Sequence, residues 1–157
     1  SQGKSGEAAK KFGEVTSGGH SGYGFLARMN MAAELAAAGK ANEAVKAYDE
    51  IAAASSAEPN LRNAARIRAT LLLVDTASRE EIIKRVADLG KPDNVWRNQA
   101  REILALAAYR ANDYAEADRL MNEIVLDQES PPNLRQRAQL MISLLAPHLG
   151  ESKPAVQ

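Results

Sequence analysis

Carboxylates are the side chains best placed to do chemistry in this sequence, since its 157 residues include no cysteine and only two histidines. Paired carboxylates such as Glu80 and Glu81 act as general acid and base when burial and mutual repulsion separate their pKa values. Glutamates also open four copies of one pattern, at Glu7, Glu43, Glu81 and Glu116. Each stands where a helix would begin, and a carboxylate there interacts favourably with the positive end of the helix dipole. We therefore interpret these glutamates as helix starts rather than catalytic groups.

Two other features could carry chemistry, but neither has the surroundings that the chemistry requires. His20 and His148 have no His or Glu four residues on and belong to no metal-binding spacing. The glycine-rich segment 17–22 follows a predicted helix rather than a strand, and it lacks the Lys-Ser/Thr ending of a phosphate loop. A hinge between helices is the better interpretation of that segment. The sequence predicts no enzyme, no metal and no cofactor.

The elements that position these residues follow a repeat. In each copy, the residue after Glu is small or aliphatic, a large apolar residue comes four positions later, and an aliphatic residue comes three positions after that. The residues after Glu are Ala8, Ala44, Ile82 and Ala117, at steps of 36, 38 and 35 residues. A period of this size is typical of stacked helical repeats, whose extended surfaces bind partners.

A longer period supports the shorter one. The segment Pro-Asn-Leu-Arg at 59–62 recurs 73 residues later at 132–135. The same shift repeats Ala-Arg at 27–28 and 100–101, Glu-Ala at 43–44 and 116–117, and Glu-Ile at 50–51 and 123–124. The structural unit is therefore predicted to be two helical hairpins, used about twice.

Composition narrows the class of protein. Hydrophobic residues make up 45% of the chain but aromatic residues only 4%, which suits thin, alanine-rich helical layers. Lys plus Arg and Asp plus Glu are equal at 20 each, so no basic excess favours a nucleic acid partner. No apolar run reaches the ~18–20 residues of a membrane span. Because the chain begins at Ser1, in what reads as the second half of a repeat, we expect a soluble fragment of a longer protein, and an anchor or a targeting segment upstream of it stays open.

One helical domain is expected over residues 6–146, between a disordered start at 1–5 and a disordered tail at 147–157. It comprises a half repeat at 6–16, repeats at 22–54, 60–90 and 93–127, and a capping helix at 131–146. About eight helices are expected: 7–16, 23–38, 42–54, 61–74, 79–89, 93 or 94 to 110, 114–126 and 132–146. Gly39 should end one helix, and Asn60, Ser78 and Asp113 are predicted N-caps.

The repeats resemble tetratricopeptide repeats. That motif has a small residue in its first helix, alanine and an aromatic residue in its second, and a closing proline. The matching residues are Ala32, Ala44, Tyr48 and Pro59 in the second repeat, and Ala105, Ala117, Met121 and Pro131 in the fourth. The sequence departs from the motif at Arg28 and Arg101, which hold its tryptophan position, and at Ile82, where alanine is usual. The resemblance implies an all-α fold of antiparallel helix hairpins stacked as a short right-handed solenoid.

A more particular combination consists of Tyr-Gly-Phe-Leu-Ala-Arg at 23–28, Val-Asp-Thr-Ala at 74–77 and Trp-Arg-Asn-Gln-Ala-Arg-Glu at 96–102. It is similar to the tetratricopeptide-like domain of the ancillary Sec translocon subunit family of Gram-negative bacteria, over about residues 7–146. Members of that family have one transmembrane helix and a periplasmic repeat domain. The resemblance implies a non-enzymatic scaffold on the periplasmic side of the inner membrane, which contacts translocon and chaperone proteins. It would reach the membrane only through an anchor outside this sequence.

By the same resemblance, the first helix of each repeat lines a concave groove. The groove positions are Met29, Ala33, Glu102, Leu106 and Tyr109, with Arg110 at the edge. Their mixture of apolar and small side chains, with one acid and one base, suits an extended peptide or a helix of another protein.

Alternatives stay open for the sole tryptophan and for four recurring arginines. Trp96 either covers the joint between two repeats, which we favour, or anchors a partner. Arg28, Arg62, Arg101 and Arg135 recur at equivalent places. They either bridge neighbouring repeats, which we also favour, or capture a carboxylate of a ligand.

Self-association is the alternative function. A repeat array that is cut at its N-terminal end exposes an apolar face. Phe12, Val15 and Phe25 would then pack on a second copy of the chain. Under this hypothesis the protein is a homo-oligomerisation module of an envelope assembly factor.

Overall fold

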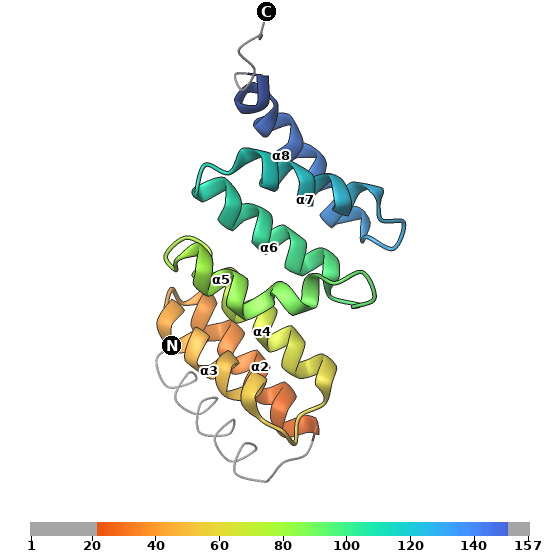
Figure 1. Ribbon diagram of the computed structural model, residues 1–157. Coiled ribbons are helices and arrows are strands. Elements are labelled where there is room, and N and C mark those ends of the chain that lie inside the picture. Colours follow the sequence, from red (N-terminus) through yellow and green to blue (C-terminus); the bar gives the residue numbers. More distant parts are fainter. Residues whose placement is uncertain (1–21, 151–157) are drawn as a thin grey trace, which may run out of the picture. The chain divides into compact units, whose positions relative to one another are not determined.

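The computed structural model describes residues 22–150, and within that range the chain is all-α, with no strand. Its α-helices are α2 (Gly22–Ala37), α3 (Ala41–Ala53), α4 (Pro59–Leu73), α5 (Arg79–Val86), α6 (Arg97–Arg110), α7 (Tyr114–Leu126) and α8 (Pro132–Gly150) (Figure 1). A short 3-10 helix, η1 (Ala87–Gly90), follows α5 directly. The helix predicted at 7–16 lies outside the described residues, so the predicted total of about eight helices stays a prediction.

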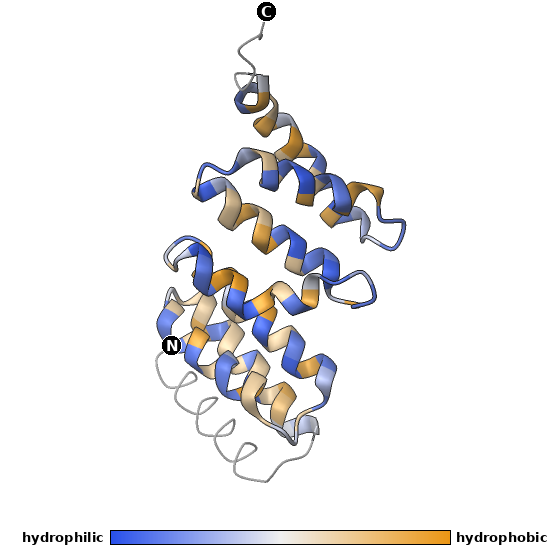
Figure 2. Ribbon diagram, in the orientation of Figure 1, coloured by the Kyte–Doolittle hydropathy of each residue, from blue (hydrophilic) through white to orange (hydrophobic). Residues whose placement is uncertain are grey.

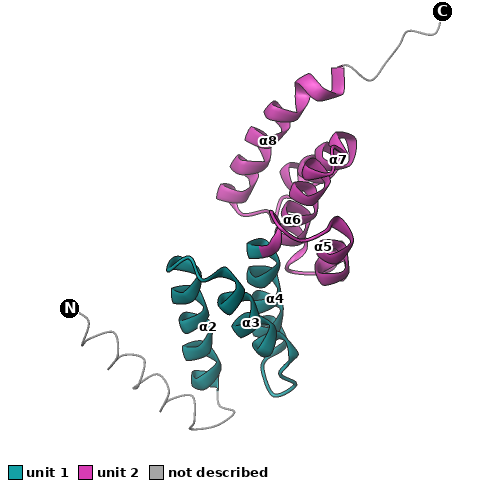
Figure 3. Cartoon of the chain, turned by 90° about the vertical axis from the view of Figure 1, so that its left-hand side faces the viewer, with its two compact units in different colours: residues 1–72 teal, residues 73–157 magenta. Residues whose placement is uncertain are grey.

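The chain divides into two compact units, one ending at Leu72 and the other beginning at Leu73 (Figure 3). Unit 1 contains α2, α3 and all but the last residue of α4, and unit 2 contains α5 to α8. The boundary falls inside the repeat predicted at 60–90. The described part of the single domain expected at 6–146 is therefore divided between two compact units.

Unit 1 is built on a hairpin of α2 and α3, whose core also takes in α4. Each helix contributes a fully buried alanine, Ala32, Ala44 and Ala65 respectively. Side chains this small let helices approach closely, because the distance between packed helices depends on the residues at the contact. The large side chains of the same core cluster are Tyr48 and Ile51 of α3 and Phe25 and Met29 of α2.

In unit 2, α7 packs on α6 and α8 packs on α7, while α5 and η1 also pack on α6. The core cluster shared by the last three helices consists of Ala105, Leu120, Met121, Ile124, Leu134 and Ala138. Figure 2 shows hydrophobic and hydrophilic residues along each of these helices. This mixture is expected for helices that bury one face and leave the other to solvent.

The 73-residue period is also present in the geometry of the helices. That shift carries α3 onto α7 residue for residue, and it carries the first residue of α4, Pro59, onto the first residue of α8, Pro132. The turns after α2 and α6 also agree, since Gly39 and Asn112 have positive φ of 77° and 59°. In both turns the next residue donates its N–H to the carbonyl five residues back, at 2.9 Å. This is the Schellman ending, and it confirms the prediction that Gly39 ends a helix.

Two predicted helix starts are confirmed by their caps. Ser78 Oγ accepts a hydrogen bond from the Glu81 backbone N–H at 3.2 Å, and Asp113 Oδ1 accepts one from the Glu116 N–H at 3.2 Å. Glu43, Glu81 and Glu116 all lie in the first turn of their helices, as expected for helix starts. Glu7 lies outside the described residues.

Other helix ends were predicted wrongly. Helix α4 begins at Pro59, so Asn60 is inside its first turn and is not the N-cap. Proline fits there because its missing N–H would have no partner in a first turn. Helix α6 begins at Arg97 rather than at residue 93 or 94, because a local turn comes first. In that turn the Asn94 side chain accepts a hydrogen bond from the backbone N–H of Trp96 at 2.8 Å.

The predicted end of the last helix near residue 146 is also wrong, as is a disordered tail that starts at 147. Helix α8 continues through Pro147 to Gly150. The His148 ring stacks on the ring of Tyr114 in α7, with centroids 4.1 Å apart. Leu149 packs against the buried cluster formed by Ala108, Ala117 and Leu145. We infer that these tertiary contacts offset the backbone hydrogen bond that proline cannot make.

Gly39 offers a test of the repeated turn. Its φ is 77° and an added Cβ would meet no atom within 4 Å, so a Gly39→Ala change adds conformational strain without a clash. We expect it to lower the free energy of unfolding by about 1 kcal/mol, measured by urea denaturation. The matched change Asn112→Gly removes the same strain from unit 2 but also removes an exposed hydrogen bond, donated by the Tyr114 hydroxyl to Asn112 Oδ1 at 2.8 Å, so we expect little net change in stability. Equal stability of Gly39→Ala and the wild type would contradict this account.

Candidate protein-binding groove

An apolar groove lies in unit 1 between the start of α2 and the start of α4. Its described lining consists of Gly22, Tyr23, Leu26, Glu58, Asn60, Leu61 and Ala64, and its volume is ≈ 730 Å³. Tyr23 and Leu26 are 84% and 53% exposed. Binding sites in proteins are typically concave and mostly apolar, with a few polar groups that orient the ligand. This groove has that character.

The groove follows from side-chain spacing on two helices. Tyr23 and Leu26 are three residues apart on α2, and Leu61 and Ala64 are three residues apart on α4, so each pair shares one helix face. Ala64 is the smallest of these side chains and leaves space between the helices. Glu58, just before α4, is the only charged residue of the described lining.

The corresponding seam in unit 2 holds a salt bridge instead. The 73-residue period places Ala64 on Arg137, which lies in α8. Arg137 donates from Nε and Nη2 to the two carboxylate oxygens of Glu102 in α6, at 2.8 and 3.0 Å. This hydrogen bonding raises the pKa of Arg137. Charged side chains thus cross between α6 and α8, whereas the equivalent positions of unit 1 hold the uncharged residues Ala64 and Met29.

The two groove positions predicted in unit 1 lie elsewhere on α2. Met29 is only 4% exposed and belongs to the core cluster with Phe25. It therefore does not line a groove, because its position faces α3 and α4 rather than solvent. Ala33 is half-buried and is not among the residues that line the groove.

The four groove positions predicted in unit 2 make contacts within the unit. Glu102 is bound to Arg137, and Leu106 is half-buried. The Tyr109 ring meets the Tyr114 ring edge-on, with centroids 5.6 Å apart. Arg110 Nη1 donates to the backbone carbonyls of Val74 and Ala77, the latter at 3.1 Å. The charged members of the predicted groove are thus already paired.

The residues predicted for a self-association face are also placed differently. Phe12 and Val15 lie outside the described residues. Phe25 is 5% exposed in the core of unit 1, and the Arg28 guanidinium lies 5.8 Å from the centre of its ring. Phe25 is therefore not available to a second copy. Trp96 is half-buried just before α6, which leaves both of its predicted roles open.

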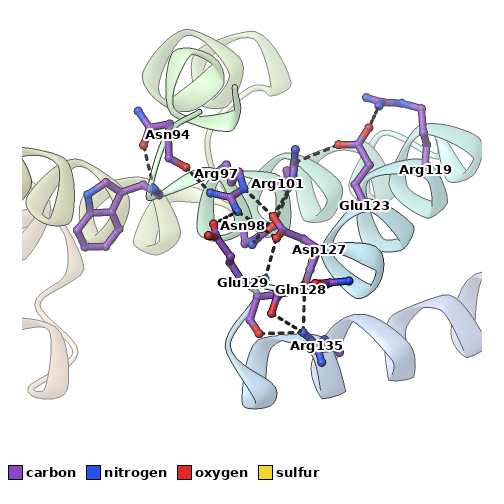
Figure 4. Close-up of polar contacts among 12 residues, drawn as sticks. Asn94, Arg97, Asn98, Arg101, Arg119, Glu123, Asp127, Gln128, Glu129 and Arg135 are labelled. Atoms are coloured by element: carbon purple, nitrogen blue, oxygen red, sulfur yellow. Dashed lines mark hydrogen bonds and ion pairs between the residues drawn. The ribbon is translucent and has the colours of Figure 1, made fainter. Parts of the chain in front are cut away.

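Unit 2 contains a polar network that the sequence analysis missed (Figure 4). Its centre is Asp127, which follows α7 and accepts hydrogen bonds from Arg97 at 2.6 and 3.0 Å and from Asn98 at 3.0 Å. Arg101 lies 3.4 Å from the same carboxylate, and Arg97 also donates to Glu129 at 2.5 Å. The side chains of Arg97 and Asp127 are each 13% exposed. The network fixes the connection between α7 and α8 onto the first turn of α6.

Arginines lower the pKa values of three carboxylates of unit 2, Asp113, Glu116 and Asp127. The Arg97 hydrogen bond keeps the pKa of Asp127 well below its usual range, and the Arg79 hydrogen bond lowers the pKa of Asp113. The Arg119 hydrogen bond lowers the pKa of Glu116. A general base works best with a pKa near the operating pH, and these groups are shifted away from it. Their arrangement suits stability rather than proton transfer.

Two of the recurring arginines, Arg28 and Arg101, form ion pairs, but within a hairpin rather than between repeats. Arg28 pairs with Glu50 at 3.5 Å, and 73 residues later Arg101 pairs with Glu123 at 3.0 Å. Each pair joins the two helices of one hairpin, so the predicted bridge between neighbouring repeats is wrong for these two. The Arg101 contact is an ion pair without hydrogen-bond geometry at Nε.

Arg135 has a different role. Its Nη2 donates to the backbone carbonyls of Asp127, Gln128 and Ser130, at 3.0 to 3.3 Å. All three carbonyls belong to the connection between α7 and α8. The charge of Arg135 therefore stabilises a loop, and the sequence signal for it was its place in the repeated Pro-Asn-Leu-Arg segment.

Residues 22–150 contain no group of three or more His, Cys, Asp or Glu side chains that could hold a metal ion. None of the helices in this range combines the length and apolar composition of a membrane span. Comparison with protein families, curated proteins and solved structures found no match to this sequence. The interpretation of the groove and of the network is therefore based on the residues that form them.

Asp127 is the position at which to test the network. An Asp127→Asn change removes the charge that pairs with Arg97 and Arg101, and hydrogen bonds to charged groups contribute roughly 1.5–3 kcal/mol. We expect a loss of about 2 kcal/mol in the free energy of unfolding at neutral pH, measured by urea denaturation. Asp93→Asn, at an exposed position before the turn, is the matched control and should change stability little.

The stabilities of the wild type and Asp127→Asn can also be compared as a function of pH. Because the folded pKa of Asp127 is lowered, its stabilisation is complete above the unfolded pKa of about 3.9 and is lost as the pH falls through the folded pKa. The stability difference between wild type and Asp127→Asn should be constant above about pH 5 and shrink below about pH 4. A difference that persists unchanged in acid would refute the assignment.

Proposed function

We propose that this chain is a non-enzymatic protein–protein interaction scaffold that binds partner proteins through the groove of unit 1. The observation that carries the proposal is the exposure of Tyr23 and Leu26 in a concave apolar site. Large apolar side chains gathered at one surface favour an interaction site over an unspecialised surface.

The lining of the groove specifies the chemistry of the ligand. Tyr23, Leu26 and Leu61 suit apolar side chains spaced along one face of a helix or along an extended peptide. Glu58 lies just before the first residue of α4, where its carboxylate can pair with a lysine or arginine of the ligand. The ligand is therefore an apolar peptide segment with a basic residue beside it.

The charged groups of unit 2 stabilise its fold, which is consistent with a non-enzymatic protein. Hydrogen bonds from arginines lower the pKa values of Asp113, Glu116 and Asp127. Such pairs hold the helices of unit 2 in a fixed arrangement. These features favour a scaffold over an enzyme.

The sequence resemblance supplies a finer form of the proposal. The segments at 23–28, 74–77 and 96–102 resemble the ancillary Sec translocon subunit family. On that basis the chain is the periplasmic, tetratricopeptide-like part of a membrane-anchored protein, stacked as a short right-handed solenoid. Its partners would be components of the translocon and chaperones of the envelope.

The groove is tested by selecting peptides from a random display library on the immobilised chain. We expect enriched peptides with apolar residues at helical spacing and a lysine or arginine, and we expect Leu26→Glu to weaken their binding at least tenfold, or by about 1.4 kcal/mol. Met31→Glu is the matched control, since Met31 is also exposed on α2 but does not line the groove. Fluorescence anisotropy measures both. Equal binding by the two variants would rule out the groove.

The finer proposal has its own test. The full-length protein, expressed from its native gene and captured by a C-terminal tag after mild cross-linking, should enrich translocon or chaperone components. Capture with Leu26→Glu in the same protein should enrich them less. If neither protein enriches these components in repeated experiments, the translocon role is wrong, while peptide binding by the isolated chain is judged separately.

A further inference from the structure

We propose that residues 7–16 of this chain, called the N-terminal segment below, occupy the groove of unit 1 when no partner is bound. A partner protein then has to displace the segment, which makes it autoinhibitory. This inference rests on the proposed function of the groove and adds a form of regulation to it. In the arrangement that we propose, Phe12 enters the groove and Lys11 lies near Glu58.

The N-terminal segment has the chemistry that the groove favours in a ligand. Ala8, Phe12 and Val15 are separated by four and three residues, so they share one face when the segment is helical. At 100° per residue, Lys11 borders this apolar face and Lys10 lies opposite to it. The segment thus combines an apolar face with an adjacent basic residue.

Charge complementarity selects this segment as the occupant. Glu58 is exposed and is the only charged residue of the described lining. Lys11 can therefore pair with it without meeting a like charge from the lining. The glutamates of the segment, Glu7 and Glu14, lie farther from the apolar face than Lys11. Because an exposed ion pair contributes little affinity, the apolar contacts hold the segment and the charge determines which way it lies.

The covalent connection brings the segment to its own binding site. Gly22 is the first described residue and itself lines the groove. The connecting residues 17–22 include three glycines, which permit the backbone conformations of a tight reversal. A linker of this length and composition gives an effective concentration in the millimolar range. Even a weak contact between segment and groove is then enough to keep most grooves occupied.

The internal repeat offers the segment a second place, but that place is polar. The pattern of the segment recurs in α5 and η1, which pack on α6. In α6, Ile103 and Ala107 are each 2% exposed. The 73-residue period places these two residues on Asn30 and Glu34 of α2, which are both exposed. Since apolar side chains gain by leaving water, the apolar groove is the more favourable place for Phe12.

Peptides selected on the groove measure whether the segment blocks it. Phe12→Glu should release the segment, and the apparent dissociation constant scales with the fraction of open grooves. If the segment occupies about nine-tenths of the grooves, Phe12→Glu binds these peptides about tenfold more tightly than the wild type. Lys11→Glu places a like charge near Glu58 and should produce a smaller gain. Lys10→Glu is the matched control on the opposite face and should bind like the wild type.

The position of the segment is tested without any peptide by zero-length carbodiimide cross-linking of the wild-type chain. Mass spectrometry should find an amide bond between Lys11 and Glu58, and excess selected peptide should reduce its yield. A link from Lys11 to Glu34 marks the second place instead. A mixture of isotope-labelled and unlabelled chains distinguishes links within one chain from links between two.

The outcomes separate this inference from the proposed function. Equal peptide binding by the wild type and Phe12→Glu would overturn the inference and leave the groove as a binding site. So would a link to Glu34 in place of Glu58, the absence of a link to Glu58, or a link that forms only between two chains. If no variant binds any peptide while the link within one chain forms, the proposed function is wrong and the segment is the occupant of the groove.

Discussion

Close packing of helices over alanine is the constraint on which both units depend. Ala32 and Ala44 in unit 1, and Ala105 and Ala117 in unit 2, are fully buried and hold the same places in the two copies of the repeat. Such small side chains let the helices of a hairpin approach closely, and the larger core residues then fill the space beside them. A larger residue at one of these places would separate the helices or strain them. The scarcity of aromatic residues follows from the same constraint.

The two units share a repeated arrangement of helices but carry different side chains between those helices. In unit 2, the connection between α7 and α8 is tied to α6 by Arg97, Asp127 and their neighbours, and the Glu102–Arg137 pair joins α6 to α8. In unit 1, alanine stands where Arg137 would be, and an apolar groove remains. Breaking a partly buried ion pair is costly because the remaining charge lacks a partner. The charged network therefore specifies one arrangement of unit 2, while unit 1 keeps the apolar groove that we propose as a binding site.

The sequence predicted the parts of the fold that depend on neighbouring residues. The caps at Ser78 and Asp113, the glycine ending at Gly39 and the all-α class each follow from local chemistry. The failures involved residues that are distant in sequence. A proline such as Pro147 normally ends a helix, so the sequence predicts that the last helix stops before it. Helix α8 instead continues to Gly150, where the His148 ring stacks on the ring of Tyr114. Met29 and Phe25 were expected at surfaces, but α3 and α4 contribute to the core cluster that buries them.

The sequence by itself determined the helical class, the two-fold internal repeat and the positions of most turns, because periodicity, capping and glycine conformation act over a few residues. Only the tertiary structure decided which faces of those helices are exposed. The groove depends on Ala64 in α4 lying near Leu26 in α2, and the network depends on Asp127 lying near Arg97. Residues separated by about 30 positions or more meet only after the helices pack. Burial, charge pairing and the open apolar surfaces are therefore properties of the packed helices.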